Sequence, residues 1–404
     1  MTDLKNAVSP DGEWLVFYTG SVEEPYNLTL NLLSIPDGEI VPVSRLLSGD
    51  MAENLTAVAE YYAQQGDELL GWETLKMFVF DHSIFSVAWS PDSRFLAFAG
   101  QMDGPSSDLY IFDVQTGEIQ RKTDDLRILS DISWSPDGGW LVIQNTVPGT
   151  VQNGSSLHLI KASGGIVKNP PVLEKGFRWA GYGWATPSMY MITNAPEGGD
   201  LNGLRYLNVK TETIIDLWPG IYFAYAVDPE NKIIAISGAP ERSADGSYLE
   251  YGLYFVSFDG QKKKLTDTIY WELYFCGGVD NQFIGNDGIK MDAISKDGNI
   301  TELNVESDAT PSYFLLSPNK QWFVLYGASG TMMLYSANDQ LVRTFPEIKT
   351  EDALWRADSS GLIVINGKEL FFISIPDGEP VKIDQCPLDD RSCWFHEQDM
   401  VWIP

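Results

Sequence analysis

A short turn motif recurs along this chain and constrains its fold more than any other feature. Ser-Pro-Asp-Gly occupies residues 9–12, and variants occupy 90–93, 135–138, 228–231 and 317–320, each followed by an apolar run. Proline presets φ for a turn, and the Asp and Ser side chains cap the turn through local hydrogen bonds. A turn repeated with the same neighbours indicates a repeated structural unit.

The unit has a regular length. From Pro91 to Ala357, which stands where the proline would be in a last unit, the steps average about 44 residues, within the range of about 40–50 expected for four-stranded propeller blades. A degenerate unit near residues 279–282 fills the longest gap. We therefore predict eight blades, with seven as the alternative if the degenerate unit merges with a neighbour.

The second unit shows the internal order of strands most clearly. Residues 85–89 alternate apolar and small side chains, 94–99 form an apolar run, 108–113 form a third run, and 115–118 have the composition of a hairpin turn. Short, evenly spaced strands separated by turn residues predict an all-β fold of four-stranded antiparallel blades.

This pattern resembles the TolB-like β-propellers, which are built from WD-like repeats. In that family a strand ending in an aromatic residue precedes Ser-Pro-Asp-Gly, an apolar strand, and then a strand ending in Asp. The resemblance covers nearly the full length and implies a single β-propeller domain over residues 1–404. The family includes periplasmic binding scaffolds and the propeller halves of serine peptidases. It therefore implies an extracytoplasmic location (periplasmic, cell-surface or secreted), with any signal or anchor absent from these 404 residues.

Charge limits the partners that we expect. The chain has 27 Lys and Arg against 56 Asp and Glu, a net charge of −29. Such a chain repels phosphate backbones and anionic lipids, and no apolar run approaches the roughly 18 residues of a membrane span. We expect a monomer with a protein, peptide or glycan ligand, no nucleic acid partner and no direct membrane insertion.

Two segments depart from the repeat. The insertion at 48–80 predicts a helix at about 51–65, because Asp50 and Glu53 match a capping box and the apolar residues that follow have helical spacing. The helix is a lid, a docking site for a protein, or a cover for an edge of the fold. The segment 392–404 copies the start of a unit and predicts a part in closing the ring, although the sequence leaves open which strand closes it.

Three cysteines bear on the redox environment. Cys386 and Cys393 bracket the loop 387–392 near the end of the chain, a spacing that predicts a disulfide more readily than a zinc site because no second cysteine pair lies nearby. Cys276 lies in an apolar stretch and is expected to be buried without a disulfide. We expect no metal site and no cofactor.

No complete catalytic motif is present. The chain has only His82, His158 and His396, and it lacks the Gly-x-Ser-x-Gly, His-Glu-x-x-His, Walker and dinucleotide-binding motifs. We therefore predict no catalytic residues. The tryptophans at the ends of the first and the starts of the second strands are expected to pack in the core.

Aromatic residues at the entrances to the first strands are the best candidates for a ligand site, because the repeat places no fixed demand on these positions. In propellers these entrances surround the axial opening, and aromatic faces with one Arg and one Glu suit a sugar or a peptide. The alternative is that they pack between blades. The predicted ligand-binding residues are Arg178, Trp179, Tyr222, Tyr270, Trp271, Glu272 and Tyr313.

Three functions remain open at this point. The first, which the intact repeat favours, is a non-enzymatic binding or scaffold propeller that recognises its ligand at the axial opening. The second is a glycan- or peptide-active enzyme that uses carboxylates in the central funnel. The third is a subunit that docks a protein through the helix at 51–65.

Overall fold

All named elements of the described chain are β-strands, which confirms the predicted all-β class. The computed structural model describes residues 7–19, 29–35, 37–47, 49, 86–102, 106–124, 128–146, 156–168, 177–196, 202–242, 247–276, 283–303, 311–327, 331–336, 341–349, 352–356, 358–366 and 369–385. In these ranges we find no helix with the length and hydropathy needed to cross a membrane. The chain divides into a first unit (1–201, 206–215 and 403–404) and a second unit (202–205 and 216–402).

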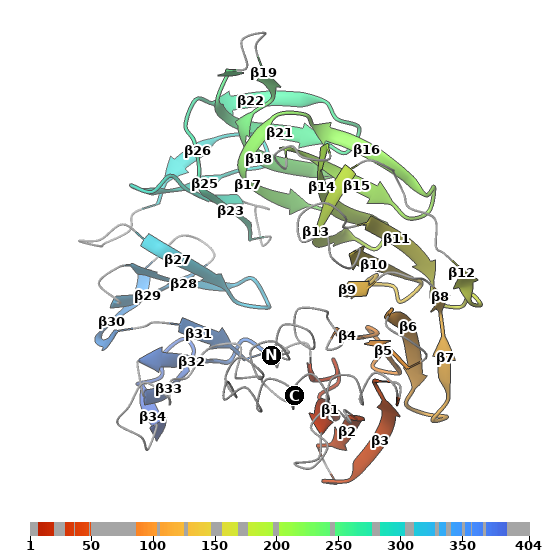
Figure 1. The fold of residues 1–404 in the computed structure, drawn as a ribbon. Helices are drawn as coiled ribbons and strands as arrows, with labels where there is room; N and C mark the ends of the chain where they lie inside the picture. The colour runs from red at the N-terminus through yellow and green to blue at the C-terminus, as the bar shows by residue number, and fades with distance from the viewer. Residues whose placement is uncertain are drawn as a thin grey trace, which may run out of the picture. The chain divides into compact units, whose positions relative to one another are not determined.

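The first unit opens with three antiparallel sheets, in each of which strands adjacent in space follow one another in sequence (Figure 1). The sheets are β1 (Trp14–Thr19), β2 (Thr29–Ser34) and β3 (Ile40–Arg45); β4 (Val87–Trp89), β5 (Phe95–Gly100), β6 (Asp108–Asp113) and β7 (Ile119–Arg121); and β9 (Ile128–Trp134), β10 (Trp140–Thr146) and β11 (Ser156–Lys161). Two short strands, β8 (Thr123–Asp124) and β12 (Val167–Lys168), pair in parallel.

The next sheet contains the boundary between the units, which passes through its last two strands. Its strands are β13 (Phe177–Thr186), β14 (Met189–Pro196), β15 (Asn202–Asn208) and β16 (Thr213–Trp218).

The second unit continues with four sheets of four strands each. They are β17 (Ile221–Asp228), β18 (Ile233–Ala239), β21 (Gly252–Ser257) and β22 (Lys262–Thr266); β23 (Glu272–Phe275), β24 (Phe283–Asn286), β25 (Met291–Ile294) and β26 (Ile300–Glu302); β27 (Pro311–Leu316), β28 (Trp322–Gly327), β29 (Thr331–Ser336) and β30 (Leu341–Lys349); and β31 (Asp352–Trp355), β32 (Gly361–Asn366), β33 (Glu369–Ser374) and β34 (Val381–Gln385). A hairpin of β19 (Glu241–Arg242) and β20 (Tyr248–Leu249) lies between β18 and β21.

The described residues thus form six four-stranded and two three-stranded antiparallel sheets, together with two short two-stranded pairs. The fold is a β-propeller of four-stranded antiparallel blades. Strand β6 has the predicted bounds, and the sheet β23–β26 occupies the interval in which we predicted a degenerate unit. The count of eight blades stays a prediction, as does the single domain over 1–404.

The recurring turn is held by the hydrogen bonds that its composition predicts. In the second sequence repeat, Ser90 Oγ donates to Asp92 Oδ1 (2.6 Å) and accepts from the backbone N–H of Phe95 (2.9 Å). The fourth turn residue, Ser93, has φ of 59°, a left-handed conformation that explains why glycine stands there in the motif at 9–12. Ser93 Oγ also accepts from the backbone N–H of Asp11 (3.0 Å), which links two consecutive turns.

The tryptophans at the ends of first strands have a structural role that the sequence predicted only in part. Their indole N–H groups donate to the preceding sheet: Trp134 Nε1 lies 2.9 Å from Ala88 O, Trp184 Nε1 lies 3.0 Å from Ser133 Oγ, and Trp355 Nε1 lies 3.2 Å from Leu315 O. Each of these tryptophans therefore ties its own sheet to the one before it, in addition to filling the core.

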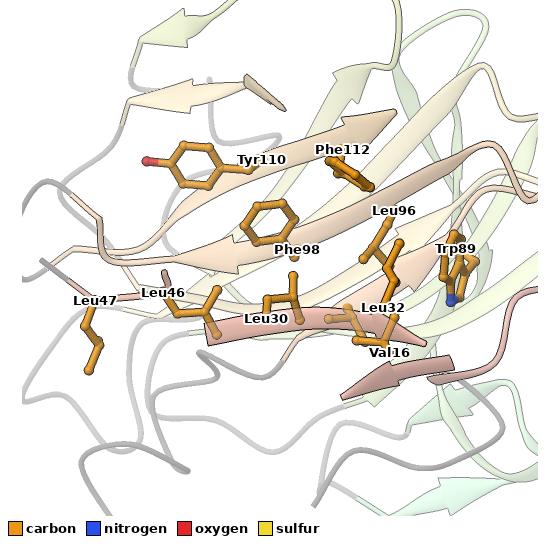
Figure 2. Packing of buried hydrophobic residues seen from close by; sticks show 11 residues of the cluster. Val16, Leu30, Leu32, Leu46, Leu47, Trp89, Leu96, Phe98, Tyr110 and Phe112 are labelled. Atoms are coloured by element: carbon orange, nitrogen blue, oxygen red, sulfur yellow. The ribbon is translucent and has the colours of Figure 1, made fainter. Parts of the chain in front are cut away.

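Apolar side chains fill the space between consecutive sheets. Figure 2 shows Leu96 and Phe98 of β5 facing Leu30 and Leu32 of β2, all of them fully buried. Strands β1–β3 and β4–β7 are therefore joined by a shared core, which burial of apolar surface stabilises.

Several predictions fall outside the described residues and stay predictions. These are the helix at 51–65 within the insertion 48–80, the ring-closing segment 392–404, and the disulfide between Cys386 and Cys393. Cys276 is described and is buried, as we expected.

Candidate functional site

The seven predicted ligand-binding residues lie where the first strands of four sheets begin. Arg178 and Trp179 are in β13, Tyr222 is in β17, Tyr270 and Trp271 immediately precede β23, Glu272 is the first residue of β23, and Tyr313 is in β27. The side chains of Arg178, Trp179 and Tyr313 are outside the described part of the structure. Their roles as ligand-binding residues stay predictions.

Tyr270 is a correction to the predicted site, because its side chain is inaccessible to a ligand. It is 0% exposed, and its hydroxyl donates to Asp292 Oδ2 at 2.7 Å. Burial, followed by the bond to Asp292, raises the pKa of Tyr270. The ring covers Gly285, where an added Cβ would lie 2.4 Å from Tyr270 Cδ1. Tyr270 is therefore a packing residue of the second unit, which is the alternative that the sequence left open.

Trp271 points the other way and joins an exposed set of rings. Its side chain is 58% exposed, and its ring centroid lies 5.0 Å from that of Phe223. Phe223 stacks on Tyr251, which is 40% exposed, at 6.1 Å with an interplanar angle of 20°. We call Phe223, Tyr251 and Trp271 the aromatic group. It offers flat apolar surface to solvent in the second unit.

A β-bulge places Phe223 in this group. Tyr222 pairs with Gly238 and Ala224 pairs with Ser237, so that Phe223 is the extra residue of β17. Bulges re-aim side chains and recur beside functional sites. First strands of three other sheets have a register shift near the same place, and the extra residues are Ser130, Tyr182 and Ser312.

The remaining two predicted residues have partners inside the protein. The Tyr222 ring lies edge-on to Tyr225 at 6.0 Å. Glu272 Oε2 accepts hydrogen bonds from Asn286 Nδ2 (3.1 Å) and from the Tyr274 hydroxyl (3.2 Å). Burial, followed by the charge of Glu272, raises the pKa of Tyr274. Tyr222 and Glu272 are therefore sequence neighbours of Phe223 and Trp271, but their side chains contact other residues of the protein.

Sequence reasoning missed a carboxylate in the first unit. Asp131 follows the extra residue of β9 and is exposed, yet the surrounding protein removes enough water to raise the pKa of its carboxyl. The backbone N–H of Ile132 donates to Asp131 Oδ1 (2.9 Å) and acts in the opposite direction. Only the register shift, which is invisible in the sequence, distinguishes this position.

The first unit also contains a cavity of about 520 Å³ between two of its sheets. Its walls come from the strands β5–β7 on one side and from Trp134, the turn at 138–139 and residues 162–163 on the other. Lys122 lines the cavity and is only 3% exposed. Burial lowers the pKa of this lysine. Within the described ranges no cluster of three or more His, Cys, Asp or Glu side chains is arranged to hold a metal ion.

Comparison with known proteins gives three kinds of match. The model of the WD domain, G-beta repeat, matches residues 73–104. Over 55 residues the chain is 40% identical to the "Uncharacterized peptidase YuxL" of Bacillus subtilis (strain 168), and this stretch spans 14% of the chain and 8% of that peptidase.

Among solved structures, a eukaryotic initiation factor is similar with a TM-score of 0.53 and 10% identity, over 95% of this chain and 88% of that one. An oligogalacturonate lyase from Vibrio parahaemolyticus (TM-score 0.40, 11% identity, 96% of this chain and 78% of that one) and a prolyl endopeptidase (0.48, 13%, 87% and 58%) are similar at lower scores.

These matches correct the prediction of function. The expected non-enzymatic binding or scaffold propeller, and the expectation that the chain is not an enzyme, are wrong, since the protein matched at 40% identity over 55 residues is named as a peptidase. At 10–13% identity the solved structures show the fold alone. The repeat match at residues 73–104 agrees with the antiparallel sheets, and the chain has a β-propeller fold.

Proposed function

We propose that this chain is a peptide-active enzyme built on a TolB-like propeller, and that the aromatic group binds its peptide substrate. The observation that carries the proposal is the 55-residue match, at 40% identity, to a protein named as a peptidase. The proposed site of action is extracytoplasmic, in keeping with the resemblance of the repeats to TolB-like propellers.

The aromatic group has the properties that peptide binding requires. Two of its three rings are at least 40% exposed, and the bulge at Phe223 holds the third against both of them. Rigid aromatic faces contribute strongly to binding because they bury a large area at little cost in side-chain entropy. Gly288 packs beside Trp271, where an added Cβ would touch the indole at 3.4 Å, and its φ of +89° favours glycine at this position.

Charge favours peptides over acidic glycans as the substrate. A net charge of −29 creates a field that repels polyanions and attracts cationic groups. The preferred peptide therefore carries an apolar or aromatic residue for the aromatic group, and basic residues increase the rate at which it associates. Raising the ionic strength should weaken the preference for basic residues without removing the preference for the apolar one.

A digest of a defined peptide mixture tests the proposal. The purified protein is incubated with synthetic peptides of varied sequence, and new termini are identified by mass spectrometry. We expect cleavage at a restricted set of sequences rich in apolar residues. Failure to cleave any peptide would refute the proposed activity. Equal cleavage by wild type and Trp271→Ala would refute the assigned site while leaving the activity in place.

The matched control for this digest is Ile166→Ala. Ile166 is 57% exposed, close to the 58% of Trp271, but it lies in the first unit and outside the aromatic group. A loss of activity caused merely by truncating an exposed apolar side chain would affect both variants. A loss caused by removing a substrate contact should affect only Trp271→Ala.

A further inference from the structure

The cavity of the first unit is lined by a buried lysine, Lys122, which forms no ion pair with any residue that the structure describes. Lys122 Nζ donates to Gln120 Oε1 (3.1 Å) and to Gly164 O (2.8 Å), and both acceptors are neutral. An ammonium group has three N–H donors. Among the described residues, Lys122 makes no ion pair with a carboxylate and has no acceptor for its third N–H.

The backbone holds Lys122 in this position from both sides. Its N–H donates to Leu109 O (2.7 Å) on β6, and its C=O accepts from the N–H of Val167 (2.8 Å), the first residue of β12. The backbone of Lys122 is therefore fixed between two strands, and the bonds from Nζ to Gln120 and Gly164 hold its side chain in the cavity wall. Holding an unpaired buried ammonium is costly, typically by several kcal/mol, unless an anion compensates it.

The walls of the cavity define the rest of the ligand. Trp134 and Phe95 stack with their ring centroids 6.4 Å apart, and they supply an apolar face. Arg94 also lines the cavity, but its charge is already compensated by Asp113, whose Oδ2 lies 2.8 Å from Arg94 Nη2. Lys122 is therefore the preferred partner for an anionic ligand group. Glu118 lines the cavity and is exposed, so it places a negative charge at the solvent side.

We propose that this cavity binds a small zwitterion, namely an amino acid with an apolar side chain. Its carboxylate accepts from Lys122, its side chain packs on Trp134 and Phe95, and its ammonium group faces Glu118. The volume of about 520 Å³ lies within the range of roughly 300–1,000 Å³ of small-molecule sites and exceeds what one amino acid needs. The proposal does not depend on the proposed peptidase activity, because an amino acid has no peptide bond to cleave.

Three related probes separate the contacts in a calorimetric titration of the 404-residue protein. L-phenylalanine has both charges, phenethylamine lacks the carboxylate, and 3-phenylpropionate lacks the ammonium group. We expect phenethylamine to bind about 10- to 100-fold more weakly than L-phenylalanine, because it loses a buried charge-assisted hydrogen bond. We expect 3-phenylpropionate to lose no more than about fivefold, because the contact with Glu118 is exposed.

Variants test the same contacts from the side of the protein. Lys122→Met should weaken the binding of L-phenylalanine about 10- to 100-fold and leave that of phenethylamine unchanged. The control Lys296→Met removes an exposed lysine of the second unit and should change neither. A thermal melt of the unliganded variants gives a second measurement, in which Lys122→Met should unfold no lower than wild type because a buried unpaired charge is gone.

Three outcomes would overturn the proposal. The first is no binding of L-phenylalanine to the wild-type protein up to millimolar concentration. The second is equal affinity for L-phenylalanine and phenethylamine, which requires no variant and so holds even if Lys122→Met does not fold. The third is a Lys122→Met protein that melts at a lower temperature than wild type and binds L-phenylalanine with the same affinity as wild type. That result would give Lys122 a structural role only, as the donor to Gly164 O.

Discussion

Replacing Tyr270 by phenylalanine isolates one buried hydroxyl from the packing of its ring. The hydroxyl donates to Asp292 Oδ2 (2.7 Å), while the other oxygen of Asp292 accepts from Lys290 Nζ (3.0 Å). The ring stays in place, so the change removes only a hydrogen bond to a carboxylate that is 1% exposed. Bonds to charged groups contribute about 1.5–3 kcal/mol, and because Lys290 still compensates Asp292 we expect a loss of about 2 kcal/mol.

Urea unfolding followed by circular dichroism measures this loss as a shift of the midpoint with an unchanged slope. A double-mutant cycle with Asp292→Asn should give a coupling energy of about 1–2 kcal/mol. Tyr251→Phe, which removes a hydroxyl from an exposed ring, is the control and should stay within about 0.5 kcal/mol of wild type. A Tyr270→Phe protein as stable as this control would refute the structural assignment of Tyr270.

The pH dependence provides an independent check on the same residue. The pKa of Tyr270 is raised above the value of about 10 of an unfolded tyrosine, so its hydroxyl stabilises the fold fully below pH 10. That contribution is lost as the pH rises through the folded pKa. The difference in stability between wild type and Tyr270→Phe should therefore shrink above pH 10.

Three further predictions concern the first unit and the cysteines. Asp131→Asn should raise the melting temperature at pH 7, because the folded protein raises the pKa of Asp131 and so disfavours its ionised form. The gain should shrink as the pH falls through the raised folded pKa and be nearly absent at pH 3, where the carboxyl is mostly protonated in both states, and an unchanged gain at pH 3 would contradict this cause. Ser90→Ala should cost about 1–2 kcal/mol in chemical denaturation, because it leaves Asp92 Oδ1 and the N–H of Phe95 without their turn partner, whereas a loss under 0.5 kcal/mol would show that water replaces the hydroxyl. Mass mapping of the non-reduced protein should find Cys386 joined to Cys393 and Cys276 as a thiol; two alkylatable thiols at 386 and 393 would count against the disulfide.

The fold could be predicted from the sequence because the same turn and strand pattern recurs in each sequence repeat. The turn at 90–93 is held by the Ser and Asp side chains that the motif names, and strand β6 has the predicted bounds. These features depend on neighbours in sequence, so composition and spacing are sufficient to find them.

The candidate site could be predicted only in part, because exposure depends on residues distant in sequence. Tyr270 and Trp271 are adjacent, yet the first covers Gly285 and the second stands in water. A glycine within a strand often marks a close approach, and Gly285 was the available signal for the burial of Tyr270. The bulge that turns Phe223 toward Trp271, and the cavity beside Lys122, arise from pairing between strands and have no sequence pattern of their own.

Steady-state kinetics on the peptide cleaved fastest by the wild-type protein test the central claim most directly. If the aromatic group binds the substrate, Trp271→Ala should raise KM about tenfold or more, with a smaller change in kcat, and Ile166→Ala should leave both constants unchanged. Peptide cleavage whose KM is the same in all three proteins would contradict the assigned site, and the absence of cleavage by any of them would contradict the proposed function itself.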